Sequence, residues 1–407
     1  MAEKQTYLDE EEATFDDLDL DAVDLAEGEE EVDLSGFGEI DDTVEYPHIK
    51  ISTKSLKEFL KVSRQISGSM GRDVVSKSIS FEVVGEQVYL RSTDFDVYLE
   101  KSVELLNQEA VLSGPLAIPQ EILIKLIKAA PGNTVFYKDE EGYKMRLAGG
   151  DIPLETYNID VEKFKFTDPV ERKLSFTSTE LYRIMKDFGP VVSAAVSPTE
   201  RRIVCENGTS YANYMWAIIS SGTAFGDMDL KMKDLNVLRP LLINVEEELT
   251  FLATKAEAKV DRRVIRGSTF QYAFLVSDTK VSTVLKESMA DVLLEDGVFI
   301  DFMQYYKMID VAAELPYSVG KVGLNFNEDG SLRLLIKTKK DKDALFTLTG
   351  SVSGAPKPLA EELILQARLL KIVLKAFAAH SSIKISLSDR GLGIRTDAYS
   401  AVIYNEA

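Results

Sequence analysis

The fold is decided by one stretch of sequence, residues 49–66, which reads IKISTKSLKEFLKVSRQI. Apolar and polar residues alternate at its start, which predicts a short strand at Ile49–Ile51. From Lys54 to Ile66 apolar residues recur every third or fourth position, which predicts an amphipathic helix. The same alternation predicts three further strands, at Ser78–Val84, Gln87–Arg91 and Val97–Val103.

This order of one strand, one helix and three strands recurs along the chain after Tyr46-Pro47. Six units begin near residues 49, 116, 174, 228, 298 and 361, at spacings of about 54 to 70 residues. Helix starts are marked by Pro119 as a first helical residue, by Thr177 and Glu180 as a capping box, and by Asp301 as an N-cap. Two units per domain predict an α+β protein of three tandem domains. The predicted parts are an acidic tail at 1–46 and domains at 47–165, 170–285 and 295–407, with linkers around Val161–Lys173 and Thr279–Glu295.

The excess negative charge lies at the start of the chain. The 407 residues carry 47 Lys+Arg against 67 Asp+Glu, a formal net charge of −20. Residues 1–46 hold 19 of these carboxylates and one cation, Lys4, so the remaining 361 residues have a net charge of only −2. Repulsion and sparse apolar residues predict a disordered tail that acts as a solvated spacer, as a recognition segment, or as a competitor of a polyanion for a basic surface. The acidic composition therefore does not exclude nucleic acid as a ligand of the body.

Composition excludes several kinds of site. Cys205 is the single cysteine, which rules out an intramolecular disulfide and a thiolate cluster, and His48 and His380 are too few for a multi-histidine metal site. The sequence has no phosphate-binding glycine loop and no nucleophile motif, and carboxylate pairs such as Asp94 and Asp96 are typical of turns. We therefore expect a protein that is not an enzyme and has no metal or cofactor. It has no apolar run of about 18 residues and no secretory leader, so we expect no membrane contact and a cytoplasmic location.

The predicted helices share a basic face opposite their apolar face. At about 100° per residue, the cations of the first helix fall within an arc of about 80°, and those of the last within about 60°. A charged face on one helix is usually just solvated, but its recurrence in four helices predicts a shared positive surface. Lys and Arg without aromatic or amide side chains between them are typical of phosphate contact rather than base reading. The predicted DNA contacts are Lys54, Lys57, Lys61, Arg64, Lys125, Lys128, Arg183, Lys186, Arg368, Lys371 and Lys375.

Two segments of the first unit carry a family resemblance: LRSTDFDV at residues 90–97 and SGSMGR at residues 67–72. They resemble the threonine–aspartate strand motif and the glycine-rich loop of the bacterial-type DNA polymerase sliding clamp, the beta subunit of DNA polymerase III. With the six repeats, the resemblance spans residues 47–407. It implies a head-to-tail homodimeric ring, with helices inside and double-stranded DNA bound without sequence preference. It also implies that Arg72 contacts DNA, that the ring tethers a DNA polymerase as a processivity factor, and that an ATP-driven clamp loader opens it.

The resemblance implies two protein contacts as well. Ile152 and Leu154 match the dimer interface, although strand alternation alone would bury one of them. Asn213, Trp216, Val402 and Tyr404 match a hydrophobic cleft between the second and third domains that binds partner peptides. Asn213 stands where the family motif has aspartate, and Tyr404-Asn405 replace a methionine–proline pair. These departures indicate a divergent clamp, such as a virus-encoded one, with a different peptide partner.

Two other functions stay open from the sequence. One is a clamp-like platform that recruits transcription or repair factors to DNA. The other is a structural array of repeats outside the cell or in a virion, which the basic helix faces disfavour. Of the three, we expect the processivity factor.

Overall fold

The computed structural model describes residues 44–66, 73–107, 109–130, 132–147, 150–157, 159–195, 197, 201–276, 280–315, 318–339 and 343–405. All of them belong to one unit of tertiary contacts, residues 42–407. The predicted disordered tail up to residue 43 and the loop that contains Arg72 lie outside the described residues.

The first repeat forms the elements that its alternation predicts. Helix α1 buries Leu56, Phe59 and Leu60, because residues three and four apart lie on one side of a helix. In the turn of the threonine–aspartate motif, the Thr93 hydroxyl donates to the Val97 carbonyl over 2.7 Å. The elements are β1 (His48–Ser52), α1 (Thr53–Ser63), β2 (Ser78–Val84), β3 (Gln87–Thr93) and β4 (Tyr98–Glu104).

The second repeat differs from the prediction at the start of its helix. Pro119 is the last residue of a strand and the N-cap of the helix, with ψ 126°, because it pairs with Ser78 of β2; the prediction of a first helical residue was wrong. The last strand ends at Pro153, and beyond it the Tyr157 N–H donates to the Ala117 carbonyl. The elements are β5 (Leu116–Pro119), α2 (Gln120–Ile127), β6 (Asn133–Lys138), β7 (Tyr143–Leu147) and β8 (Gly150–Pro153).

The third repeat confirms one half of the predicted capping box. The Thr177 hydroxyl accepts the Glu180 N–H, but the Glu180 carboxylate accepts the Ala224 N–H instead of returning to the N-cap. The third repeat has β9 (Val170–Thr177), α3 (Ser178–Ala194), β10 (Arg202–Glu206), β11 (Thr209–Tyr214) and β12 (Ala217–Gly222). The fourth has β13 (Met228–Lys231), α4 (Met232–Leu242), β14 (Glu248–Thr254), β15 (Arg262–Arg266) and β16 (Phe270–Leu275).

The fifth and sixth repeats complete the chain. Asp301 is the predicted N-cap, and its carboxylate accepts the Gln304 N–H over 2.7 Å. The fifth repeat has β17 (Gly297–Asp301), α6 (Phe302–Glu314), β18 (Ser318–Phe326), β19 (Leu332–Thr338), β20 (Ala344–Leu348) and β21 (Ser351–Ser353). The sixth has β22 (Leu363–Gln366), α7 (Ala367–Leu374) followed by a 3₁₀ turn (Lys375–Phe377), β23 (Ser382–Ser388), β24 (Gly391–Arg395) and β25 (Tyr399–Tyr404).

The two predicted linkers contain regular structure. Residues 161–164 form a 3₁₀ turn, and β9 begins at Val170, inside the first linker. The second linker is largely a helix, α5 (Thr283–Leu294), which the sequence analysis missed. Its signal was present, because Leu285, Met289 and Val292 recur at spacings of four and three residues.

Two of the sheets run across the predicted domain boundaries. One eight-stranded sheet has the order β5-β2-β3-β4-β16-β15-β14-β9, and one nine-stranded sheet has the order β13-β10-β11-β12-β25-β24-β23-β17-β21. The joining pairs are β4 with β16 and β12 with β25, both antiparallel. Two four-stranded sheets, β1-β6-β7-β8 and β20-β19-β18-β22, complete the set. The division at residues 165–170 and 285–295 stays a prediction.

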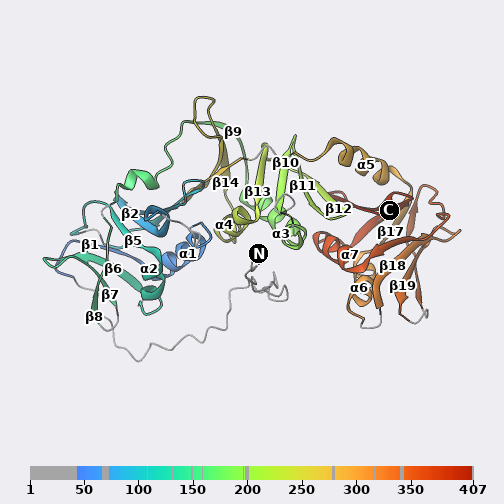
Figure 1. Ribbon diagram of the computed structural model, residues 1–407, viewed down its shortest axis with the longest axis horizontal. Helices are drawn as coiled ribbons and strands as arrows, with labels where there is room; N and C mark the ends of the chain where they lie inside the picture. Colours follow the sequence, from blue (N-terminus) through green and yellow to red (C-terminus); the bar gives the residue numbers. More distant parts are fainter. Residues whose placement is uncertain are drawn as a thin grey trace, which may run out of the picture. The chain divides into compact units, whose positions relative to one another are not determined.

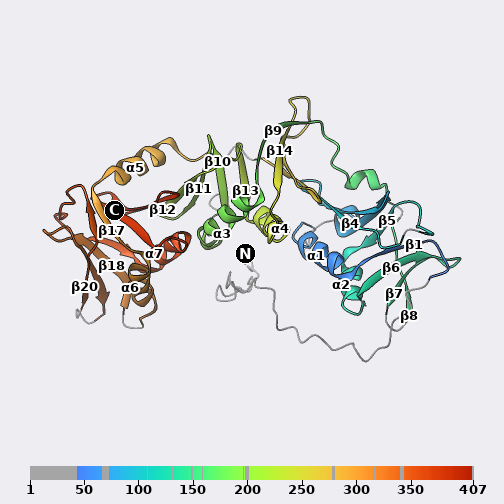
Figure 2. The same cartoon turned by 180° about the vertical axis from the view of Figure 1, so that it is seen from behind.

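The helices form a continuous row within residues 42–407. Contacts join α2 to α1, α1 to α4, α4 to α3, α3 to α7 and α7 to α6. The same order can be followed in Figures 1 and 2. Helix α5 contacts β23, β24 and β25 instead of this row. None of the described helices is long and apolar enough to cross a membrane.

Candidate nucleic-acid interface

The first half of the helix row exposes the predicted cations. The apolar residues of α1 and α2 are buried in the core, so the helix periodicity places the charged side chains on the outer side. None of them forms an ion pair with another residue in the part of the chain that is described. The exposed cations are Lys54, Lys57, Lys61 and Arg64 at α1, and Lys125 and Lys128 at α2.

Arg183 and Lys186 extend the positive surface along α3. Both are exposed, and the Arg183 guanidinium lies 5.8 Å from the ring centre of Tyr399. The Tyr399 hydroxyl donates to the carboxylate of Asp187, whose pKa is raised by burial despite this hydrogen bond and the nearby cations. Asp187 is therefore held by Tyr399 beside these cations, and burial disfavours its ionised form.

Helix α7 separates the three cations predicted on it. Arg368 and Lys375 are exposed, but Lys371 turns toward α6. There its ammonium lies 2.7 Å from a carboxylate oxygen of Asp310 and 2.7 Å from one of Glu314. Burial opposes the charge, yet these two partners raise the pKa of Lys371. Lys371 is thus neutralised within the chain.

Helix α4, at the middle of the row, presents less free charge. Lys233 forms an ion pair with Asp94, which lies in the turn between β3 and β4. This ion pair joins the fourth repeat to the first. Arg239 is half-buried. The contact with Asp94 gives the motif at 90–97 a structural role.

The residues of the predicted partner-peptide cleft lie in different environments. Val402 is fully buried, and with Ile218 it contacts Met289 and Val292 of α5. The Tyr404 hydroxyl donates to the Leu285 carbonyl of the same helix over 3.2 Å. Trp216 is 50% exposed in the turn after β11, and Asn213 is half-buried. The chain's own α5 therefore covers part of the surface at which a partner peptide is predicted to bind.

The two residues of the predicted dimer interface are also separated. Ile152, on β8, is 36% exposed, whereas Leu154 is 8% exposed and belongs to the chain's own core. In the described residues β8 pairs with β7 alone, which leaves its other edge without a strand partner. Strand β20 is the corresponding edge at the other end of the chain, and its Leu345 is 58% exposed.

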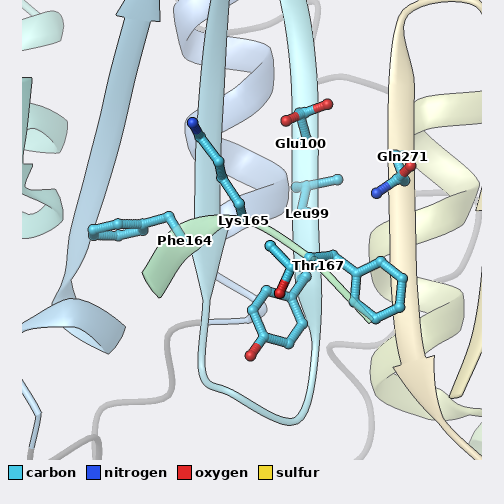
Figure 3. A pocket seen from close by; sticks show the side chains of 8 residues that line it. Leu99, Glu100, Phe164, Lys165, Thr167 and Gln271 are labelled. Carbon is cyan, nitrogen blue, oxygen red and sulfur yellow. The ribbon is translucent and has the colours of Figure 1, made fainter. Parts of the chain in front are cut away.

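A small cavity of about 250 Å³ lies where β4 meets β16. Figure 3 shows Leu99 and Glu100 on one strand and Gln271 on the next, crossed by the segment that carries Phe164, Lys165 and Thr167. Glu82, next to this cavity, accepts from Lys165 and Arg91, and these hydrogen bonds lower its pKa although burial opposes the shift. Since its charged lining residues are already paired, Glu100 with Arg91 and Lys165 with Glu82 and Glu162, we assign this cavity to the seam between two repeats.

The described side chains offer little for catalysis or metal binding. Burial raises the pKa of the Cys205 thiol to about 12, so the thiol stays protonated and is a poor nucleophile. Within the described ranges no three His, Cys, Asp or Glu residues are grouped so that they could hold a metal ion. His380 packs edge-on against Tyr399, and His48 bonds to the Tyr46 carbonyl.

Comparison with known proteins identifies the architecture. No family model matches the chain, and no curated protein matches it. Among solved structures, it is similar to the DNA polymerase III subunit beta of Pseudomonas aeruginosa (17% identity, TM-score 0.68) and the DNA polymerase sliding clamp of Bacillus subtilis (12% identity, TM-score 0.71). It is also similar to the beta subunit of the Streptococcus pyogenes DNA polymerase (15% identity, TM-score 0.67). The matches cover 88%, 89% and 88% of this chain and 99% of each of the others. The predicted α+β fold is confirmed: the chain has the fold of the bacterial DNA polymerase sliding clamp.

Proposed function

We propose that the protein is a DNA sliding clamp, in which two copies close into a ring around duplex DNA and tether the replicative polymerase. One observation carries the proposal: a continuous row of contacting helices exposes cations that have no ion-pair partner in the described part of the chain. The acidic excess lies in residues 1–46 and leaves the body nearly neutral. A row of free cations on such a body is suited to a polyanion.

The cations are suited to the phosphate backbone rather than to bases. They are lysine and arginine side chains at helical spacing, and contacts of this kind give binding that is sequence-independent and sensitive to salt. Weak contacts are sufficient for a closed ring, because the ring has to open before it can leave circular DNA. The same weakness allows sliding.

Ring closure is supported by the two strand edges. Strands β8 and β20 end separate four-stranded sheets, and each carries an exposed apolar residue, Ile152 and Leu345. An open strand edge pairs readily with another strand, so β8 of one copy and β20 of a second copy could continue one antiparallel sheet. Two such contacts per pair of chains would close a head-to-tail dimer.

The ring acts by raising the concentration of its partner at the primer end. A polymerase bound to a ring that cannot leave the duplex rebinds its substrate as an intramolecular event. The proposal makes this protein a processivity factor with no catalytic step of its own, located with the replicating DNA in the cytoplasm. Its partners are a DNA polymerase and an ATP-driven clamp loader.

The test is topological and needs no loader. Cysteines at Ile152 and Leu345 are joined across the two copies by a bismaleimide after incubation with nicked circular plasmid. We expect the cross-linked dimer to stay on the plasmid at about 1 M salt, where phosphate contacts are screened. Cutting the plasmid once should release it.

The matched control places cysteines at Val284 and Leu294, which are exposed on α5 rather than on a strand edge. This variant should not be retained after cross-linking. Equal retention of the first variant on circular and linear DNA would defeat the proposal, because contact rather than topology would then hold the protein.

A further inference from the structure

Helix α5 covers an apolar patch on the face of the nine-stranded sheet that points away from the helix row. Ile219 and Ala401 belong to the main core, so the preceding and following residues, Ile218 and Val402, point to the other face by strand alternation. Met289 and Val292 of α5 bury these two residues. They are the two side chains of α5 that are fully buried.

Polar contacts hold α5 at both ends. Near its start, the Lys286 ammonium pairs with Glu206 of β10 and lies 5.5 Å from the ring centre of Tyr211. Near its end, Asp291 pairs with Arg390 at 2.7 Å, and both of these side chains are exposed. Further polar contacts run from Tyr404 Oη to the Leu285 carbonyl, from Ser386 Oγ to the Val292 carbonyl, and from Ser220 Oγ to Met289 Sδ.

A glycine on β24 allows the close approach of the helix. A Cβ added at Gly393 would first meet Ser386 Oγ on the neighbouring strand, and it would also lie 3.3 Å from the Val292 carbonyl oxygen and 3.4 Å from a methyl carbon of Leu293. The surface under α5 is therefore shaped for a helix in this position.

Helix α5 has little stability of its own. It is 12 residues long, has no side-chain N-cap hydrogen bond, and has no acidic residue in its first turn and no basic residue in its last. Its Lys286 lies near the positive end of the helix dipole and Asp291 near the negative end, which disfavours the isolated helix. Helices of this length are marginal in water. Both charges find their partners on the sheet, so α5 is stable as a helix only while it is docked.

We propose that α5 is a built-in, reversibly bound ligand of this surface, which a partner's segment must displace in order to bind. Undocking would break the two ion pairs and unfold the helix at the same time. The helix is unstable without the ion pairs, and the ion pairs require the helix. The free surface then offers Ile218 and Val402 between Glu206 at one end and Arg390 at the other.

The geometry of α5 specifies the chemistry of the partner. The segment carries two apolar side chains three residues apart, in the places of Met289 and Val292. A cation three residues before the first of them meets Glu206, and a carboxylate one residue before the second meets Arg390. A short amphipathic peptide of this pattern is the occupant that the surface fits.

Hydrogen exchange of the unmodified full-length protein is the first test. Local undocking predicts that amides of residues 287–294 exchange at least about 100-fold faster than those of α3 and β12. Exchange of α5 only at the rate of these core elements would overturn the proposal, because α5 would then open only with the whole fold.

A labelled synthetic peptide of residues 281–295 is the second probe. In the M289D/V292D variant, α5 no longer binds the sheet. The peptide should therefore bind this variant at least about 10-fold more tightly than it binds the original protein, because α5 of the original protein competes at high effective concentration. The matched control is V284D/L294D, because these positions are 72% and 78% exposed on the same helix and the charge change is identical. This control should behave like the original protein.

A charge swap checks the orientation of the bound segment. The peptide with Lys286→Glu should lose about 10-fold in affinity for M289D/V292D and regain it when Glu206→Lys is added, since the ion pair is restored. Peptide binding that is equal in M289D/V292D and V284D/L294D would overturn the proposal.

The inference rests on the proposed function only for the partner's role in replication. Neither probe uses DNA or a second subunit, so a failed plasmid assay and a failed peptide assay are separate results.

Discussion

The Tyr272 hydroxyl donates a hydrogen bond to Asp234 Oδ1 over 2.6 Å, and both side chains are buried between α4 and β16. Asp234 Oδ2 accepts the Lys231 N–H as well. Burial nevertheless outweighs both hydrogen bonds and raises the pKa of Asp234 to about 6. A buried carboxylate with this pKa makes the stability of the body depend on pH.

The sign follows from proton binding. Between about pH 4 and pH 6 the folded state holds a proton on Asp234 that the unfolded state has lost, so the free energy of unfolding falls as pH rises through this window. Above about pH 6, the ionised Asp234 carboxylate lowers the free energy of unfolding by on the order of 3 kcal/mol. D234N should remove this part of the slope, because its amide oxygen can still accept the Lys231 N–H while its amide N–H donates to the Tyr272 hydroxyl oxygen. Denaturant titrations at several pH values measure the effect.

D389N is the control for that measurement, because Asp389 is exposed. It should retain the slope of the original protein. The assignment to Asp234 fails if D234N and D389N give the same pH dependence.

Charge reversal on α1 tests the DNA contacts. K57E/K61E should weaken binding to duplex DNA by at least about 10-fold and reduce the slope of log affinity against log salt by roughly 2, since two phosphate contacts are lost. Fluorescence anisotropy over a range of salt concentrations measures both quantities. K255E/K259E, in the exposed loop between β14 and β15, is the control with equal charge change and should alter neither quantity. An unchanged salt slope in K57E/K61E would remove α1 from the interface.

The two lysines of the α7 region should respond in opposite ways. K371E places a carboxylate against Asp310 and Glu314, so it should lower the free energy of unfolding by about 1–2 kcal/mol, a figure reduced for the exposure of its partners. K375E, at an exposed position, should weaken DNA binding with little change in stability. Thermal melts and anisotropy on both variants separate the effects. Equal effects of the two on DNA binding would place Lys371 among the phosphate contacts.

Lysine at the strand edges should prevent self-association. We expect I152K/L345K to sediment as a monomer at concentrations at which the original protein is a dimer, because charge at an apolar edge disfavours strand pairing. L294K, at a residue that is more exposed still but lies on α5, should leave the mass unchanged. A dimer that persists in I152K/L345K would show that the copies associate elsewhere.

The local sequence pattern was sufficient to predict most helices and strands, and the wrong predictions have physical causes. The strand predicted at Ser78–Val84 agrees with β2 at both ends, because strand alternation bounded by turns is a local property. Pro119 was misassigned because its pairing with Ser78, far away in sequence, keeps it extended. Glu180 caps Ala224 rather than its own helix for the same reason. The family resemblance supplied Ile152 and Val402, but alternation could not tell that Ile152 stays exposed while α5 buries Val402.

By itself, the sequence determined the six repeats, the helices and strands within them, and which side of each helix is charged, because apolar spacing of two or of three to four residues is set along the chain. The tertiary structure alone decided which of those charges stay free and which apolar surfaces stay open. Lys371 meets α6 while Lys375 meets solvent, and α5 lies on Val402, because strand pairs such as β12 with β25 bring distant segments together and no local spacing records that pairing.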